Sequence, residues 1–543
     1  MLLAAIMASQ AGATEARELS WSAYLDKVHG AWLGQCIGVT LGTPWEFQVK
    51  YPDDVITSYD SGRLGKMPDG TPEQDDVLTE LAVLAGLRKA GPQFTYDDLS
   101  AAWREHVPPK AVYCATQTAM EAIYEGIKGP DSGHPKYNNW WHSIDSQIQG
   151  ELVGCLTPGM PKTCREYAHM MAHMVNYAEG ADGGIFVSCC VSEAFVNNDV
   201  EGIIRGSLGS LHPDSPYARM VRDVLEWRQR YDDWHKTRDL LAARYEPHGV
   251  VGAVLNGGVV VLALLYGGGE FEKSICIATM AGWDSDCNPA TVGAILGAMW
   301  GAHAIPEKWS APIHNTYRNI SVTAYPEEVQ IDQVALETAQ LGEQIAVAHG
   351  ATVVGEGDQR ILRLPAQRHD APETLEEVPG AQAEVFLDHF RAFHDTFTPK
   401  WVIQDYESWN PEWICLGKRP TCTRIGSLLG YTDVLAGVHF AGQPPVTFVP
   451  RGGTTQSGGT LQVRVACARP PGATEAGGLF VRILVNGETA KEMKVSLAPK
   501  EDIRGDIAEC PVKKGDAVTI ELGHSDETQA PTGVVIDDIK IVD

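Results

Sequence analysis

The chain of 543 residues is longer than one hydrophobic core usually supports, so we expect two domains. Its 44% apolar and 21% charged residues are typical of a folded globular protein and exclude a disordered one. The formal net charge of −27 argues against nucleic acid and anionic membranes as partners, because the Lys and Arg that would neutralise phosphates are outnumbered. Cations and neutral substrates fit this charge.

The first residues predict export. A short apolar run ends in Ala11-Gly12-Ala13, which is typical of the apolar segment and cleavage site of a signal peptide, although no positive residues precede it. We assign residues 1–20 to a signal peptide and expect a secreted or periplasmic protein, with the cytoplasm as the alternative. No other apolar run is long and uninterrupted enough to span a bilayer.

Residues 21–348 are predicted to form an α-helical domain. Glycine recurs at every fourth position of its first predicted helix: Gly30, Gly34, Gly38 and Gly42. These glycines share one face, which would let another helix approach closely. Pro44 ends the helix, and Glu46 lies on the loop beyond it. Glu46 is therefore either a solvated carboxylate or a carboxylate in a pocket, with its pKa raised by desolvation.

A second helix is predicted to begin with a capping box formed by Thr71 and Gln74, with Pro72 at its first position. Asp75 and Asp76 then lie in the first turn, where the positive end of the helix dipole favours carboxylates. The helix dipole alone accounts well for one Asp at this position but less well for two consecutive Asp residues. The pair is therefore a candidate for chemistry.

The segment from Gly180 to Gly184 is predicted to interrupt a helical region, which would let the backbone approach a ligand. We therefore take Asp182, Gly183 and Gly184 as candidate substrate-binding residues. His173 could line the same cavity as Asp182. The alternative is that each of these residues has only a structural role.

A further candidate motif is the turn Asp284-Ser285-Asp286, which precedes a helix rich in Gly and Ala. Two carboxylates one residue apart can point their oxygens at one centre, and Mg²⁺ prefers oxygen ligands. Alternatively, the two Asp residues only cap the helix. Asn288 is predicted as the N-cap and Pro289 as the first helical residue. Because its side chains are small, we expect this helix in the middle of a bundle.

The twelve cysteines contain no CxxC motif, which argues against a zinc ribbon. Cys155 with Cys164, and Cys415 with Cys422, could close loops in an oxidising compartment. The sequence does not determine which pairs form.

Beyond the helices, the polar and proline-bearing residues 349–390 are predicted to form a linker. Short alternating apolar runs follow, separated by turns such as Asn486-Gly487. This pattern predicts an antiparallel β-sandwich over residues 391–543, which we take as a candidate carbohydrate-binding domain.

The two acidic motifs together suggest a shared metal centre. If the helix that carries Asp75 and Asp76 meets the turn that carries Asp284 and Asp286, four negative charges crowd one place. Like charges at such distances cannot all stay ionised without compensation. Divalent cations supply it, and two of them about 3.5 to 4 Å apart would hold a polar substrate and orient a water molecule.

Three segments together resemble the ADP-ribosylglycohydrolase family: Gly38-x-x-x-Gly42-x-Pro44-x-Glu46-Phe47, Asp75-Asp76, and Asp284-x-Asp286 before a Gly- and Ala-rich helix. The resemblance covers residues 21–345. It implies an all-α orthogonal helical bundle with a binuclear Mg²⁺ centre, which hydrolyses a glycosidic bond at the anomeric carbon of a ribose. The implied catalytic residues are Glu46, Asp75 and Asp286. The implied metal ligands are Gln74, Asp75, Asp76, Asp284, Asp286 and Cys287.

Three positions depart from the family pattern. Gln74 stands where the family usually has Thr or Ser, Cys287 where it has Thr, and Val39 where an Asp often follows the glycine. A thiol is a poorer Mg²⁺ ligand than a hydroxyl oxygen, so we expect one metal position to be altered.

We therefore interpret the chain as an exported, metal-dependent glycoside hydrolase. It would use a metal-positioned water on a ribosyl-like or other glycosidic bond of a small-molecule or saccharide substrate. One alternative is a true ADP-ribosyl hydrolase that acts on a modified protein or small molecule. The other is a non-catalytic carbohydrate-binding protein with a decayed metal site.

Overall fold

The computed structural model describes residues 17–107, 111–124, 126–138, 140–246, 249–376, 413–416, 422–424, 435–439, 445–450, 453–468, 477–497, 503–525 and 532–542. The chain divides into two compact units. The first comprises the residues up to Glu376 apart from 134–141 and 244–250, and the second comprises those two segments and the residues from Glu377 onward.

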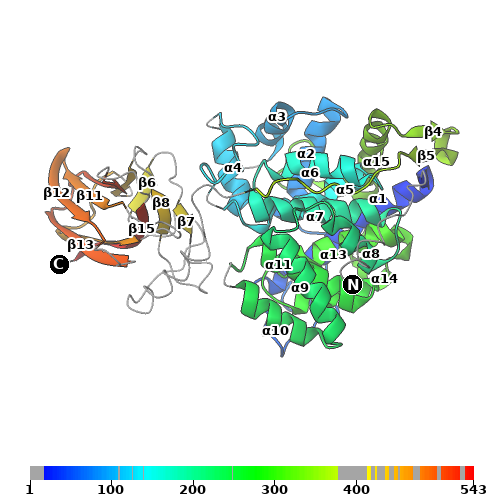
Figure 1. The fold of residues 1–543 in the computed structure, drawn as a ribbon, viewed down its shortest axis with the longest axis horizontal. Coiled ribbons are helices and arrows are strands. Elements are labelled where there is room, and N and C mark those ends of the chain that lie inside the picture. The colour runs from blue at the N-terminus through cyan, green and yellow to red at the C-terminus, as the bar shows by residue number, and fades with distance from the viewer. Residues whose placement is uncertain are drawn as a thin grey trace, which may run out of the picture. The chain divides into compact units, whose positions relative to one another are not determined.

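The first unit is built mainly from helices (Figure 1). The helices of the chain are α1 (Trp21–Gly42), α2 (Asp75–Ala90), α3 (Tyr96–His106), α4 (Cys114–Tyr124), α5 (Gly150–Leu156), α6 (Pro161–Ala172), α7 (Ala178–Ala194), α8 (Val200–Leu208), α9 (Pro216–Arg230), α10 (Trp234–Tyr245), α11 (Ala253–Gly267), α12 (Phe271–Met280), α13 (Cys287–Trp300), α14 (Glu307–Ser310) and α15 (Ile331–Ala348), with the short 3₁₀ helices η2 (Thr43–Trp45) and η3 (Ile144–Gln149). Among the described residues, no helix is long and apolar enough to cross a membrane. The predicted helical domain is confirmed.

Two helices at the centre of this unit cross with almost no side chain between them. Three pairs of residues face each other across the contact between α1 and α13, namely Gly30 with Gly297, Gly34 with Gly293 and Gly38 with Pro289, and Gly42 faces Ser285 in the turn before α13. A Cβ atom at any of these glycines of α1 would overlap backbone atoms of α13 or of the turn before it. The pairing runs in opposite directions along the two helices, so the end of α1 lies beside the start of α13. The predicted close approach and the central position of α13 are confirmed, because every residue of α13 except Trp300 is buried.

A three-stranded antiparallel sheet joins the two ends of the helical unit. β1 (Arg17–Ser20) pairs with β5 (Ile361–Leu364), which in turn pairs with β4 (Thr352–Val354). β4 and β5 lie in the stretch that we predicted as a linker, and they belong to the first unit. β1 takes the last four residues of the predicted signal peptide, whose other residues lie outside the described part of the chain. A second small sheet pairs β2 (Thr316–Arg318) with β3 (Glu328–Gln330).

The helix α2 begins later than predicted. Its first residue is Asp75, and its N-cap residue Gln74 makes no side-chain capping hydrogen bond, so the predicted capping box is wrong. The backbone of Thr71 instead bridges to Tyr317 of β2, and its hydroxyl donates to the carbonyl oxygen of Cys36 at 3.3 Å. This long-range pairing keeps the chain extended up to Gln74.

The start of α13 also differs by one residue. The helix begins at Cys287, with Asp286 as its N-cap residue, so Asn288 and Pro289 lie inside the first turn. The side-chain amide of Asn288 donates a hydrogen bond of 2.9 Å to Oδ1 of Asn256 on α11. Asn288 therefore joins two buried helices and does not cap one.

The glycines between residues 180 and 184 do not interrupt a helix, so that prediction is wrong. α7 runs from Ala178 to Ala194 without a break. A Cβ atom at Gly184 would lie 2.8 Å from the carbonyl oxygen of Ser146. The glycine therefore permits close packing of α7 on η3.

The ten cysteines whose side chains the structure describes are all free. Cys155 and Cys164 are among them and both are buried, so the loop-closing bond between them does not form. The side chains of Cys415 and Cys422 lie outside the described residues.

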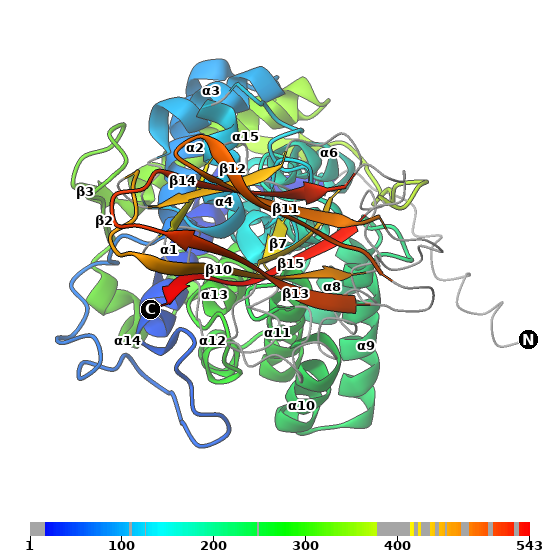
Figure 2. The same cartoon turned by 90° about the vertical axis from the view of Figure 1, so that its left-hand side faces the viewer.

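The second unit contains two five-stranded antiparallel sheets (Figure 2). Their orders are β13-β10-β15-β8-β7 and β12-β11-β14-β9-β6. The strands are β6 (Trp413–Leu416), β7 (Cys422–Arg424), β8 (Leu435–His439), β9 (Val446–Pro450), β10 (Gly459–Ala468), β11 (Leu479–Val485), β12 (Glu488–Val495), β13 (Ile503–Val512), β14 (Val518–His524) and β15 (Thr532–Val542). Alternate residues such as Leu461 and Val463 of β10 and Leu479 of β11 share one buried core. Asn486 and Gly487 form the expected turn, and the predicted β-sandwich is confirmed.

We expect Gly34→Ala to destabilise the helical unit, because its methyl group would meet the backbone of α13. The midpoint of thermal unfolding, followed by helical circular dichroism, should fall by an amount that corresponds to about 2 to 3 kcal/mol. Gly206→Ala in α8 is the matched control, since a Cβ there lies 3.3 Å from the nearest atom, in the ring of His369. Equal midpoints for the two variants would contradict this account of the helix contact.

Candidate metal centre

The loop after η2 and the turn before α13 are tied together. Because α1 and α13 are antiparallel, the loop that carries Glu46 lies beside the turn that carries Asp284. The backbone N–H of Phe47 donates a hydrogen bond of 2.9 Å to the carbonyl oxygen of Trp283. Phe47 and Trp283 have φ angles of 52° and 58°, a conformation that bulky residues rarely adopt. Surrounding contacts must therefore hold this junction in place.

The start of α2 is anchored to the same region by β2. The backbone N–H of Thr71 donates to the carbonyl oxygen of Thr316 at 2.8 Å. The hydroxyl group of Tyr317 lies 3.3 Å from both the backbone nitrogen and the carbonyl oxygen of Gln74. These contacts fix the residue just before Asp75, so the first turn of α2 has a defined position.

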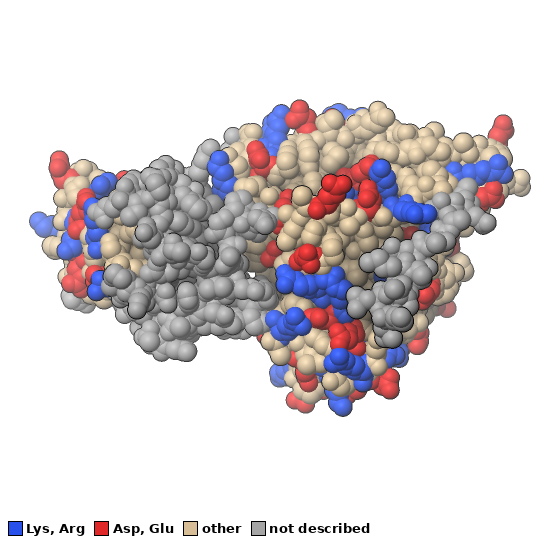
Figure 3. Space-filling view, in the orientation of Figure 1, with Lys and Arg blue, Asp and Glu red and all other residues tan. Residues whose placement is uncertain are grey.

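The two acidic motifs meet, as the sequence predicted. The thiol of Cys287 donates to Oδ1 of Asp76 at 3.3 Å, although the two residues are 211 positions apart. One ligand atom each of Asp284, Asp286 and Cys287 lie within 4.8 Å of one another. Asp76, Asp284 and Asp286 are only 1%, 4% and 3% exposed. On the face of the helical unit seen in Figure 3, acidic and basic side chains are interspersed, whereas these carboxylates are buried together.

Burial and mutual repulsion raise the pKa values of this group. The pKa of Asp75 rises to about 7 through burial, with the charges of Asp286 and Asp145 adding to the effect. The pKa of Glu46 rises to about 8 through burial and the charges of Asp286 and Asp75. Burial also raises the pKa of Asp76, Asp284 and Asp286 above the ordinary range. Charges of neighbouring carboxylates therefore add to the effect of burial in most of this group.

The donor atoms fit a divalent cation. Oδ2 of Asp76, Oδ1 of Asp284 and Oδ1 of Asp286 are buried and have no hydrogen-bond partner among the described residues. A buried carboxylate oxygen without a partner is costly, and a bound cation offsets that cost. Carboxylate oxygens are the ligands that hard divalent cations prefer. Asp286 makes no side-chain capping hydrogen bond, so helix capping does not explain its carboxylate at this position.

Three further buried acids surround the cluster, and the sequence reading missed them. Asp145 of η3 accepts hydrogen bonds from the backbone N–H of Thr116 at 2.7 Å and from the hydroxyl of Ser143 at 2.5 Å. Glu151 of α5 accepts from the hydroxyl of Thr291 at 2.6 Å. Glu80 of α2 accepts a hydrogen bond of 2.6 Å from a backbone N–H. It follows Asp76 by four residues, a spacing that places both on one face of a helix and could have identified Glu80 from the sequence. Asp145 and Glu151 had no comparable signal.

The predicted ligand Gln74 is held by another contact. Its side-chain amide nitrogen donates a hydrogen bond of 2.9 Å to the hydroxyl of Thr43 in η2. This bond joins the start of α2 to the segment that leads to Glu46. The role of Gln74 as a metal ligand stays a prediction.

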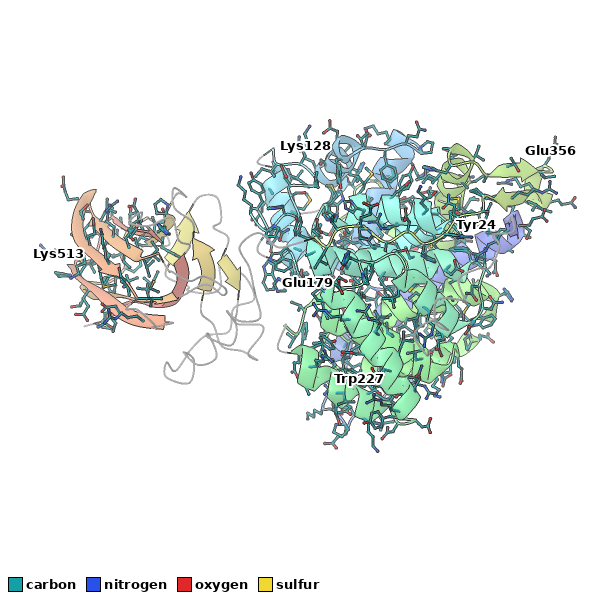
Figure 4. All side chains as sticks on the ribbon, viewed as in Figure 1. Tyr24, Lys128, Glu179, Trp227, Glu356 and Lys513 are labelled. Atoms are coloured by element: carbon teal, nitrogen blue, oxygen red, sulfur yellow. The ribbon has the colours of Figure 1, made fainter. Side chains whose placement is uncertain are left out.

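Asp182 lies at a different place from the carboxylate cluster. It lines a cavity of about 240 Å³ whose other lining residues include Arg165, His169, His173, Glu179 and Glu376. Figure 4 labels Glu179 in the first turn of α7. As expected from the sequence, His173 and Asp182 share this cavity, where Nε2 of His173 and Glu376 are 3.0 Å apart. Gly183 and Gly184 pack against η3, and the substrate-binding role of all three residues stays a prediction.

The fold and the site define a helical protein whose buried carboxylates fit divalent cations. The sequence profile described as ADP-ribosylglycohydrolase matches residues 20–345, more than half of the chain. The chain therefore belongs to the ADP-ribosylglycohydrolase family, a family of hydrolases. The resemblance seen in the three sequence motifs is confirmed.

Two solved structures are similar to parts of the chain. One is described as an ADP-ribosylglycohydrolase-related protein complex, with 17% identity and a TM-score of 0.43 over 59% of this chain and 99% of that chain. The other is described as Carbohydrate-Binding Module CBM36 in complex with calcium and xylotriose, with 16% identity and a TM-score of 0.12 over 20% of this chain and 73% of that chain. A comparison with the sequences of curated proteins found no match. Family membership therefore rests on the sequence profile.

We expect the metal-free protein to become more stable as the pH falls from about 8 to about 5. The pKa of Asp75 is about 7 in the folded chain, above its ordinary value of about 4. Folding therefore favours the protonated group, and this stability is lost as the pH rises through 4 towards 7. Thermal unfolding in excess chelator would show it, and Asp76→Asn should reduce the slope.

Asp131→Asn is the matched control for this pH experiment, because Asp131 is exposed. Its unfolding midpoint should follow the wild-type pH profile. A wild-type midpoint that falls on acidification over this range would argue against a cluster of unpaired buried carboxylates.

Proposed function

We propose that the chain is a metal-dependent glycoside hydrolase that cleaves a ribosyl-like or other glycosidic bond by attack of a water molecule. The observation that carries this proposal is the group of buried carboxylate oxygens without partners, in a region that belongs to the ADP-ribosylglycohydrolase family. The predicted signal peptide supports a secreted or periplasmic site of action.

Asp75, Asp76, Asp284 and Asp286 are the proposed ligands of Mg²⁺ at one or two positions. When bound, the cation would supply positive charge to sugar hydroxyl groups and to the charge that develops on the departing group. The backbone carbonyl oxygens of Asp284 and Asp286 accept hydrogen bonds of 3.1 Å from the first turn of α13. These bonds fix the backbone of the turn from which the two carboxylates project.

Glu46 is the proposed general base. It is half-buried on the loop that is tied to Trp283, and its raised pKa of about 8 makes its carboxylate a stronger base than an exposed one. A general base works best when its pKa lies near the working pH. Glu46 would hold the attacking water and take its proton as the anomeric carbon gains oxocarbenium character.

Two exposed aromatic side chains support a sugar or nucleoside substrate. Phe47 follows Glu46 and is 40% exposed, and Tyr113 is 61% exposed. Burial raises the pKa of Tyr113, and the charges of Asp75 and Glu46 raise it further, which supports a position of its ring beside these carboxylates. Flat apolar surfaces beside a few polar groups are typical of ligand sites.

The second candidate is a true ADP-ribosyl hydrolase, which the family membership itself favours. Release of ADP-ribose from a modified protein, measured beside release of sugar from aryl pentofuranosides, separates the two reactions. A third reading, a carbohydrate-binding protein with a decayed site, is supported instead if Mg²⁺ neither binds nor raises the unfolding midpoint.

We expect Glu46→Gln to lower kcat by roughly 100- to 10,000-fold, because the amide cannot take a proton from water. Mg²⁺ should raise the unfolding midpoint of this variant as it does for the wild type, since the four Asp ligands are unchanged. Asp53→Asn is the matched control, because Asp53 is an exposed acid in the loop between Glu46 and α2. This variant should keep the wild-type kcat and the wild-type stabilisation by Mg²⁺. A Glu46→Gln enzyme with near wild-type kcat would remove Glu46 from the mechanism.

We expect Tyr113→Ala to raise KM several-fold with a smaller effect on kcat, because the ring contacts substrate beside the reacting atoms and not at them. Steady-state kinetics on the preferred glycoside would measure both constants. Tyr124→Ala is the matched control, since Tyr124 is 54% exposed at the end of α4. Equal KM values for the two variants would place the substrate elsewhere.

A further inference from the structure

A sulfur atom faces the carboxylates of the candidate centre. Cys287 is 7% exposed, and its Sγ lies 3.3 Å from Oδ1 of Asp76. Ligand atoms of Asp284, Asp286 and Cys287 lie within 4.8 Å of one another, which lets one ion contact all three. Over the described ranges of the chain, this is the one group of three or more His, Cys, Asp or Glu with such spacing.

A second observation points to a ligand at this position. Oδ1 of Asp284 and Oδ1 of Asp286 are buried without a hydrogen-bond partner in the described structure, and so is Oδ2 of Asp76. The thiol has a single hydrogen, which Oδ1 of Asp76 accepts at 3.3 Å, so it cannot satisfy the remaining oxygens as well. The other oxygens therefore need a positive partner that the described side chains do not provide.

The chemistry of the donors selects among cations. Mg²⁺ takes oxygen ligands in near-ideal octahedral geometry and gains little from sulfur. Zn²⁺ binds Cys sulfur and Asp oxygen together and accepts four ligands. A site with a thiol beside two carboxylates therefore favours Zn²⁺ over Mg²⁺.

We propose that the position between Asp284, Asp286 and Cys287 holds a thiophilic divalent cation of the Zn²⁺ class, with Sγ of Cys287 as a ligand. This inference rests on the proposed function, because it names the cation that one position of the same centre selects. Binding breaks the S–H bond and forms a metal–thiolate bond. The released proton passes to solvent, and Oδ1 of Asp76 is placed to accept it first.

The test is a titration of the full-length protein with Co²⁺, a spectroscopic substitute for Zn²⁺, after removal of metals with a chelator. Thiolate ligation gives an intense charge-transfer band in the near ultraviolet. We expect the band in the wild type and in Cys276→Ser, whose buried thiol has Glu272 and Lys308 as charged neighbours. Cys287→Ser should lack the band.

Equilibrium dialysis with Zn²⁺ gives a second readout that does not depend on activity. The Kd for Zn²⁺ should rise in Cys287→Ser by at least the roughly 10- to 100-fold that loss of an outer partner costs. The Kd for Mg²⁺ should hold or fall, because a hydroxyl oxygen replaces sulfur. Asp286→Asn keeps the thiol and should also weaken the Co²⁺ band, which provides a variant that does not alter Cys287.

A wild-type protein without the band, or a band that Cys287→Ser leaves unchanged, would overturn the inference. If Mg²⁺ still raises the unfolding midpoint in that case, only the metal preference is wrong. If none of Mg²⁺, Zn²⁺ and Co²⁺ raises the midpoint, the proposed metal-dependent function fails as well.

Discussion

The contact between α1 and α13 is the constraint on which the site depends. Glycines at every fourth position of α1 allow its backbone to touch the backbone of α13, where any larger residue would overlap it. This close antiparallel crossing brings the loop with Glu46 to the turn with Asp284. The bond from Phe47 to Trp283 then fixes the junction. The glycines on the facing sides of the two helices thus determine which residues meet at the helix ends.

The centre concentrates unfavourable energy in one place. Several carboxylates are buried together and repel one another, and two bulky residues beside them have positive φ angles. Such features persist only when the surrounding structure stabilises them, and they are common at functional sites. Here the surrounding packing includes η3, α5 and α2, whose own acids accept hydrogen bonds from Ser143, Thr291 and a backbone N–H, although Oε2 of Glu151 is buried without a partner among the described residues. A cation would relieve the repulsion that remains.

Much of the architecture was readable from the sequence, because it follows from local patterns. The glycine spacing predicted the helix contact, alternating apolar residues predicted the β-sandwich, and the paired acids predicted where the site forms. Features set by distant partners were not readable. Thr71 looked like a helix cap but pairs with Tyr317, and the glycines of α7 looked like a break but serve packing on η3. Asp145 reaches the cluster only through the tertiary fold, so no local pattern marked it.

The small sheet of β1, β5 and β4 has a consequence for how the helical unit can be used. Arg17–Ser20 pairs with Ile361–Leu364, so the unit's first and last strands are neighbours. A domain whose ends lie together tolerates insertion into another protein or reconnection of its chain in a new order. The neighbouring first and last strands of the helical unit therefore suit it to domain insertion and circular permutation without rearrangement of its core.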